Sequence, residues 1–332
     1  MTERDTFQDE FDRAIAEERI KPSGDDAKTA RLVATNLGRL RFLGTAPQAV
    51  RLARIANDAA ISPAAADLFS RSGISRCVFM FRNDDEAQGG FSSSPGLIFL
   101  NPFSRLLAPT LVHEAAHLEQ EELGLSEWRN GIGLADMFLE NRIGEAAAFV
   151  HALEASWEMS RKIPEAWNSQ YGHEPTPFLN MSWQMLVRDD PQTRATAKAA
   201  AFKAFFGTQT MERYENRVLD SIGKMEPAEL RKLIPAPKRP RKDYDQILAA
   251  HGFPGLVHAL PDLDWNAPFW CGIHGNTHTK LMDIIAEKCP DLLPQACLPP
   301  VRLSFFSRDT CNTAARMLAG GSLGLALGSL IF

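Results

Sequence analysis

Hydrophobic residues recur mostly at helical spacing along this chain. The clearest short pattern is formed by Leu111, Ala115 and Leu118, which stand at i, i+4 and i+7 and make one apolar stripe. Pro109 stands just before the stripe and suits the first turn of a helix. We therefore predict a helix that begins near Pro109 and turns one face towards a hydrophobic core.

Further helical patterns cover much of the remaining chain. We expect helices over 27–40, 47–59, 64–72, 136–162, 191–206, 208–225 and 280–288. The longest pattern, 136–162, carries an apolar arc of Ala146, Phe149, Val150, Leu153 and Trp157. On the same helix we interpret Glu154 and Glu158 as solvated residues near the helix end, with Lys162 as the i+4 partner of Glu158.

Two short apolar runs without helical spacing predict β-strands. One is 76–81, and the other is 96–101, which is bounded by the turn-forming residues 92–95 and by Pro102. The second strand leads into the helix near Pro109. These elements predict an α+β fold that is mostly α-helical, with a small sheet packed against that helix and helical segments on both sides.

Changes in pattern divide the chain into four expected parts. They are an N-terminal helical segment at 1–75, a central domain at 76–225, a Pro-rich basic linker at 226–244 and a C-terminal segment at 245–332. Within the linker, Pro alternates closely with Lys and Arg at 235–242, which is typical of a semi-rigid spacer. The same run resembles a nuclear localisation signal, although short basic runs are usually solvated linkers.

The last 16 residues, 317–332, contain no charged side chain, and Gly320, Gly324 and Gly328 recur every four positions. In an apolar helix this spacing lets two backbones approach closely, as in membrane-helix packing. A helix needs ~20 apolar residues to span a bilayer, so this stretch is short. Membrane association or self-association through 317–332 is therefore one interpretation, and a buried C-terminal helix or a disordered end is the other.

Composition narrows the class of protein. The chain has 332 residues, 45% of them hydrophobic, so it can bury a substantial core and is long enough for two domains. Its net charge is only −5 and no extended basic surface is evident, so nucleic acid is not an expected partner. Five cysteines without a C-x-x-C pair indicate neither a disulfide framework nor a structural zinc site. The first residues open a charged amphipathic helix rather than a signal peptide, which predicts a cytoplasmic protein.

Chemistry is indicated most directly by residues 113–117, which read His-Glu-Ala-Ala-His. This H-E-x-x-H pattern presents two zinc ligands and a general base from one helix. Because residues four apart lie one turn above each other, His113 and His117 can face one ion, with Glu114 beside them. Both histidines fall nearly opposite the apolar stripe, so they are not core residues of that stripe. We predict His113 and His117 as metal ligands and Glu114 as the catalytic base.

A catalytic zinc site normally has three protein ligands, and our candidate for the third is Glu145. It follows His117 by 28 residues, in the helix predicted at 136–162. Its neighbours on the helical wheel are apolar, so its carboxylate should be partly buried and should need a partner. That partner is either the metal or an arginine, such as Arg142 three residues earlier. The alternative ligands are Asp136, Glu140 and His151.

The H-E-x-x-H helix followed by a second helix with a lone Glu is similar to the gluzincin metallopeptidases. More narrowly, 111–120 together with the Glu- and Ala-rich run at 140–148 resembles a bacterial domain family of unknown function, described only as "putative metallopeptidase". The resemblance covers 76–225 and implies a zincin-like core, one zinc ion per chain and a hydrolase, but no particular substrate. The chain differs from the commoner family pattern at Ala116, where arginine is frequent, and at Ala147, where Asp or Asn is usual.

These residues predict a zinc-dependent peptidase that acts on a peptide or protein. Zinc lowers the pKa of a bound water towards ~7, and Glu114 is expected to take a proton from that water and return it to the leaving amine. The oxyanion needs a further hydrogen-bond donor, for which we select Tyr214 in the helix at 208–225. His274 and His278 are rival donors, expected in a loop. The alternative function is that of a non-enzymatic metal-binding or membrane-associated interaction protein.

Overall fold

The computed structural model describes most of the chain. The described residues are 31–36, 38–83, 87–92, 96–104, 107–123, 132–168, 183–184, 187, 190–234, 241–253, 256–260, 263–296 and 300–301. Three predictions lie outside the described residues: the amphipathic helix at the N-terminus, the Pro-rich run at 235–240 and the apolar tail at 317–332.

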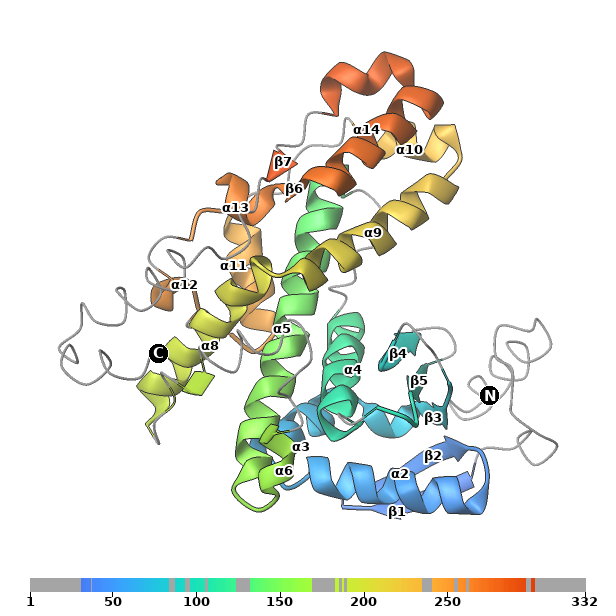
Figure 1. Cartoon of the computed structure of the whole chain (residues 1–332), viewed down its shortest axis with the longest axis vertical. Helices are drawn as coiled ribbons and strands as arrows, with labels where there is room; N and C mark the ends of the chain where they lie inside the picture. The colour runs from blue at the N-terminus through green and yellow to red at the C-terminus, as the bar shows by residue number, and fades with distance from the viewer. Residues whose placement is uncertain are drawn as a thin grey trace.

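A five-stranded mixed sheet lies beside the helices in one part of the molecule (Figure 1). Its strands, in spatial order, are β1 (Arg31–Thr35), β2 (Gly38–Leu43), β3 (Val78–Phe81), β5 (Leu97–Leu100) and β4 (Gly89–Ser92). β2, β3 and β5 run parallel, whereas β1 and β4 pair antiparallel with their neighbours. The two predicted strands are confirmed as β3 and β5, and β4 forms one edge of the described sheet.

The helix expected over 27–40 is wrong where the structure describes it. β1 and β2 form an antiparallel hairpin there, and Gly38 has a φ of 95°, a left-handed conformation that favours glycine. In β2, Leu40 and Phe42 are fully buried while Arg39 is exposed, which is the alternation of a strand. Pairing of β2 with β3 over Arg41–Leu43 continues the sheet, so tertiary pairing outweighs the local helical spacing.

Helices make up most of the remaining fold. They are α2 (Ala46–Ala59), α3 (Pro63–Arg71), α4 (Leu107–Glu122), α5 (Leu134–Ser160), α6 (Pro164–Asn168), α8 (Pro191–Phe206), α9 (Gln209–Lys224), α10 (Pro227–Leu233), α11 (Arg241–Ala250), α12 (Leu256–Ala259), α13 (Pro268–Cys271) and α14 (Gly275–Lys288). Short 3-10 turns, η2 (Ile74–Arg76) and η3 (Pro290–Gln295), and a pair of two-residue strands, β6 (Ile273–His274) and β7 (Pro300–Val301), complete it. The mostly helical α+β fold is confirmed, and within the described residues every predicted helix other than 27–40 lies within a few residues of an observed one or inside it.

α5 runs through the middle of the molecule and is covered from several sides (Figure 1). It packs against α4 and α3 near the sheet, and against α8, α9 and α13 elsewhere. Most of its 27 residues are buried as a result, charged ones included. A helix of this kind provides dry positions for functional groups, but each buried charge then needs a partner.

Glu154 and Glu158 are two such buried charges with partners. The prediction that they are solvated is wrong. Both side chains are buried. The Glu158 carboxylate accepts hydrogen bonds from Ser62 Oγ at 2.7 Å and from Arg194 at 2.8 Å, and it also binds the first turn of α3. Glu154 pairs with Lys198 of α8 at 2.5 Å. The partners come from other helices, which the spacing of charges within one helix does not reveal.

Three hydrophobic cores contain residues of α5, and two of them use different faces of this helix. The first fills the space between the sheet and α4 and includes Phe42, Phe79 and Leu111. The second lies around α8 and α13 and includes Phe202 and Trp270. Each core combines residues from both sides of a predicted boundary, and α10 lies inside the predicted linker at 226–244, so the division into four parts stays a prediction. Within the described ranges, no helix combines the length and the hydrophobicity of a membrane span.

Candidate metal centre

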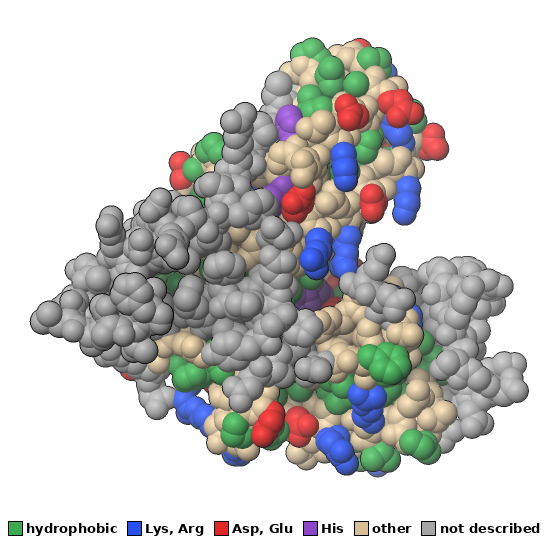
Figure 2. Space-filling view, viewed as in Figure 1, with side chains coloured by type: hydrophobic (Ala, Val, Ile, Leu, Met, Phe, Trp, Pro, Cys, Tyr) green, Lys and Arg blue, Asp and Glu red, His purple; other side chains and the backbone are tan. Residues whose placement is uncertain are grey.

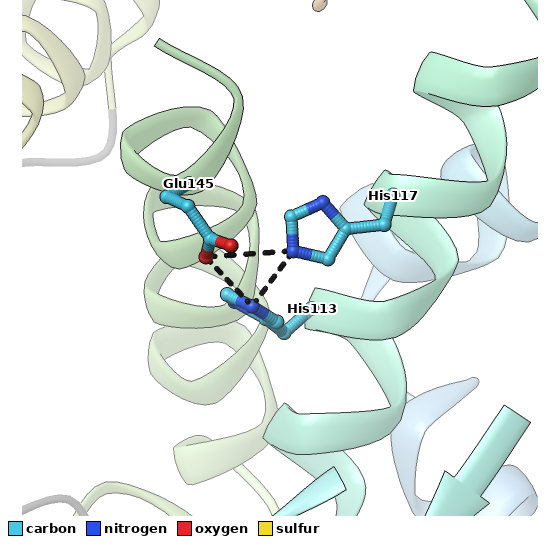
Figure 3. Close-up of side chains that lie close together, drawn as sticks. All are labelled: His113, His117 and Glu145. Atoms are coloured by element: carbon cyan, nitrogen blue, oxygen red, sulfur yellow. Dashed lines mark hydrogen bonds and ion pairs between the residues drawn. The ribbon is translucent and has the colours of Figure 1, made fainter. Parts of the chain in front are cut away.

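Three side chains from α4 and α5 point at one another (Figure 3). His113 and His117 come from α4, one turn apart, and Glu145 comes from α5. The two Nε2 atoms are 3.0 Å apart, and each lies 3.5 Å from Glu145 Oε2. Among the residues that the structure describes, this is the group of histidine, cysteine and acidic side chains that could hold a metal ion.

The spacing of these three atoms fits a small tetrahedral ion. Ligand atoms that bind zinc at ~2.0–2.2 Å in a tetrahedron lie roughly 3.3 Å from one another, and the observed separations of 3.0 and 3.5 Å bracket that value. Glu145 Oε2 is buried without a well-formed hydrogen bond, and so is His113 Nδ1. Two imidazole nitrogens and a carboxylate oxygen are also donors that suit zinc. The residues present therefore fit the metal that the sequence implies.

Electrostatics ties His117 to Glu145 in the protein without a metal. Burial acts to lower the pKa of His117, but the facing charge of Glu145 outweighs it and raises the pKa to about 10. Burial acts to raise the pKa of Glu145, but the charge of His117 and polar contacts with both imidazoles outweigh it and bring that pKa to about 2. In the metal-free protein, a proton on His117 thus supplies the positive charge that faces Glu145, and a metal ion must displace this proton to bind.

Gln120 holds His117 in place, a role that the sequence analysis missed. Its Oε1 accepts a hydrogen bond from His117 Nδ1 at 2.9 Å, and its Nε2 donates one to the Gly144 carbonyl at 3.0 Å. The carbonyl can only accept, which fixes the amide orientation and makes His117 Nδ1 the donor. His117 Nε2 is then directed at Glu145. The signal in the sequence was a Gln one turn after the second histidine.

Gly144 makes this contact possible. It directly precedes Glu145, and a Cβ at this position would lie 3.1 Å from Gln120 Oε1. With glycine there, the amide can lie close against α5.

Glu114 is buried beside the two histidines, next to the edge strand β4. A Cβ at Gly89 would lie 3.2 Å from Glu114 Oε1, so the strand backbone passes very close to this carboxylate. Burial raises the pKa of Glu114, against the charges of His113 and His117, which lower it. A carboxylate in such an environment is a stronger base than one in water.

Tyr214 lies on α9, near Glu145. Its half-buried ring packs against Phe149 and Phe205, with centroids 6.2 and 6.4 Å apart, and Phe149 in turn packs on His113 at 4.6 Å. Burial raises the pKa of Tyr214 well above its usual value, and the charge of Glu145 adds to this. The structure thus brings Tyr214 to the centre, while its catalytic role stays a prediction.

His274 and His278, the rival donors, are placed differently from the loop that we expected. His274 ends β6, and its Nδ1 lies 2.8 Å from Glu215 Oε2 in a buried pair. His278 lies inside α14. The loop prediction is therefore wrong, because the glycine between the two histidines begins a helix.

The alternative ligands are engaged elsewhere. Asp136 accepts a hydrogen bond from Tyr244, and His151 Nε2 lies 2.9 Å from the His251 carbonyl. Glu140 is buried and is not part of the metal-binding group. The Arg142 guanidinium donates to backbone carbonyls of Phe269, Trp270 and Gly272, so it turns away from Glu145.

Comparison with known proteins gives one family match. The model of the family described as "Putative metallopeptidase family (DUF6782)" matches residues 41–253. The match begins in β2 and ends just after α11, so it is longer at both ends than the resemblance over 76–225. It includes His113, His117 and Glu145, and also Glu114 and Tyr214. No curated protein and no solved structure matches the chain.

Proposed function

We propose that this chain, which belongs to the Putative metallopeptidase family (DUF6782), is a zinc-dependent peptidase of the gluzincin type. The observation that carries the proposal is the convergence of His113, His117 and Glu145 on one point, at separations of 3.0 and 3.5 Å, beside the buried Glu114. His113, His117 and Glu145 would hold one zinc ion. The family supports a peptide or protein as the substrate.

Zinc bound there would supply a Lewis acid that lowers the pKa of a water molecule towards ~7 and polarises a substrate carbonyl. Glu114 takes the proton that the attacking water loses, because its buried carboxylate has a raised pKa and lies beside the centre. Glu114 then gives this proton to the amine that leaves. One carboxylate thereby serves as base and then as acid.

Tyr214 donates a hydrogen bond to the oxyanion in this proposal. Its ring packs on Phe149, which packs on His113, so Tyr214 lies at the edge of the centre where the carbonyl would react. The raised pKa keeps the hydroxyl protonated at neutral pH, as a donor requires. Phe149 and Phe205 pack on the ring and limit its movement.

β4 supplies a place for the substrate backbone. It is the edge strand next to α4, and Gly89 brings its backbone within contact distance of Glu114. An extended peptide that pairs with this edge would therefore pass the catalytic base. Gly90 lies under the Phe99 ring, where a Cβ would be only 2.3 Å from the ring, so a larger residue would displace Phe99 or the strand.

The test is to measure zinc content and peptide hydrolysis in the same samples. Wild type is expected to contain zinc at one ion per chain and to lose hydrolysis of a denatured protein substrate when a chelator removes the metal. His117→Ala should lose both zinc and activity. His258→Ala is the matched control, because His258 is an exposed histidine on α12. Zinc-loaded wild type that cleaves no peptide would favour the non-enzymatic metal-binding alternative.

A further inference from the structure

Arg217 lies at the rim of the metal centre, on the α9 side. It follows Tyr214 by three residues on α9, and its side chain is exposed. The guanidinium carbon lies 5.0 Å from the centre of the Tyr214 ring. Figure 2 shows basic side chains where α9 passes over a hollow, and a histidine is visible in that hollow. Arg217 thus extends over the aromatic ring that borders Glu145.

Arg217 holds its positive charge beside the Tyr214 ring, at the edge of the metal centre. Some other surface arginines have acidic partners: Arg76 pairs with Glu122 at 2.6 Å and Arg231 pairs with Asp291 at 2.5 Å. For Arg217, no ion pair with a carboxylate is found among the described residues.

We propose that Arg217 binds a carboxylate of the substrate close to the cleaved bond, so that this protein prefers substrates with an acidic group there. The proposal rests on the peptidase function. Two sources supply the same chemistry, an Asp or Glu side chain and the C-terminal carboxylate of a short peptide. Arg217 is a specificity residue in either case and takes no part in bond cleavage.

A carboxylate is the ligand that this arrangement fits best. A planar guanidinium forms two parallel hydrogen bonds with a carboxylate, and stacking on an aromatic face leaves its N–H edge free for them. The centre itself contains the acidic Glu114 and Glu145, which repel an acidic substrate. Arg217 offsets this repulsion on one side.

Matched peptides test the proposal on the zinc-loaded full-length protein. Internally quenched peptides of one sequence carry Glu, Gln or Lys near the middle, and each is made with a free and with an amidated C-terminus. Wild type should cleave the carboxylate-bearing form with a kcat/KM higher by ~10-fold or more. A difference between Glu and Gln identifies a side-chain carboxylate, and a difference between free acid and amide identifies the C-terminus.

Charge reversal should reverse the preference. Arg217→Glu is expected to lose the preference for the carboxylate and to favour the Lys peptide, whereas Arg217→Lys keeps part of it, because the charge remains but the fork is lost. Arg54→Glu is the control, since Arg54 is an exposed arginine on α2 and the change in net charge is the same. It should retain the wild-type preference.

The outcomes separate this inference from the peptidase proposal. If wild type and Arg217→Glu cleave the peptides in the same ratio, the inference is wrong and the peptidase function stands. If wild type cleaves none of them, the peptidase proposal fails, and binding of the Glu and Gln peptides, measured by fluorescence anisotropy, decides on Arg217. Tighter binding of the Glu peptide that Arg217→Glu abolishes would support a carboxylate site, and equal binding would overturn it.

Discussion

Two clusters of buried charges lie one turn apart on α5, and they balance their charges in different ways. Around Arg142 the chain supplies the cation itself. The Arg142 guanidinium donates to backbone carbonyls near α13 and lies 3.7 Å from Glu215, whose other oxygen binds His274. Around Glu145, two histidines and a second acid, Glu114, face one another, and in the protein without a metal the balancing charge is a proton on His117.

The difference separates a cluster that serves the fold from the cluster that we propose as the metal centre. The Arg142 cluster joins α5, α9 and the segment of α13 and β6, and its charges are matched by groups fixed in the fold. In the Glu145 cluster, His113 Nε2, His117 Nε2 and Glu145 Oε2 are instead directed at a common point. Burial of polar groups is therefore not by itself a sign of function. A sign of function is instead the convergence of ligand atoms that an external cation can bind.

Removing Arg142 should have the largest effect on stability. Arg142→Met keeps much of the volume but leaves Glu215 and the backbone carbonyls buried without their partner, so we expect a loss of ~3–5 kcal/mol in the free energy of unfolding. Urea denaturation with and without zinc measures it, and zinc should not reverse the loss. Arg54→Met on the exposed face of α2 should change stability by less than ~0.5 kcal/mol. A loss below ~1 kcal/mol for Arg142→Met would contradict the structural role.

The Glu145 cluster should instead respond to pH through its metal. Because the pKa of His117 is raised to about 10 in the metal-free protein, zinc has to displace its proton at neutral pH. The zinc affinity should therefore rise by ~10-fold per pH unit between pH 6.5 and 7.5, with release of one proton. Calorimetry in buffers of different ionisation enthalpy counts that proton. Binding without proton release would show that His117 is already neutral.

The same shifts set the stability of the metal-free protein. The raised pKa of His117 contributes stability that is complete below its unfolded value of 6.5 and is lost as pH rises through about 10. The lowered pKa of Glu145 contributes stability that is present above its unfolded value of 4.5 and is lost as pH falls through about 2. Thermal unfolding in a chelator should thus be most resistant between pH 4.5 and 6.5, as far as this pair is concerned. His117→Ala should flatten both flanks.

Gln120 should have a smaller effect on stability than Arg142. Gln120→Leu removes the acceptor for His117 Nδ1 and the donor to Gly144, so the imidazole loses its fixed orientation. We expect zinc affinity to fall by ~10- to 100-fold while the fold is retained. Gln120→Glu keeps an acceptor for His117 and should lose less. An unchanged zinc dissociation constant in Gln120→Leu would show that Gln120 does not support metal binding by His117.

The sequence predicted the parts of the site whose geometry is local. His113 and His117 share a helix, so their spacing determines that they lie one turn apart, and the apolar neighbours of Glu145 indicated that its carboxylate is buried. Partners that are distant in sequence were not predictable in this way. Glu158 binds Ser62, 96 residues earlier, and His274 binds Glu215, 59 residues earlier.

The helix predicted over 27–40 was wrong for a related reason. The alanines and leucines of 27–40 fit a helical spacing, but the strands form because β2 pairs with β3, and α2 and α3 lie between these two strands in the sequence. A glycine at position 38 was the local signal for a turn. Gln120 likewise depends on Gly144, 24 residues away, so its role follows only from the packing of α4 on α5.

The central claim is that Glu114 transfers a proton beside a bound zinc ion, and Glu114→Gln tests it most directly. The substitution is nearly isosteric, and Glu114 is not one of the three residues that would hold the metal, which are His113, His117 and Glu145. The zinc content should therefore stay at one ion per chain. Hydrolysis of a peptide that wild type cleaves should fall by ~10²- to 10⁴-fold. If Glu114→Gln, with its zinc in place, cleaves that peptide as fast as wild type, the proposed mechanism is wrong.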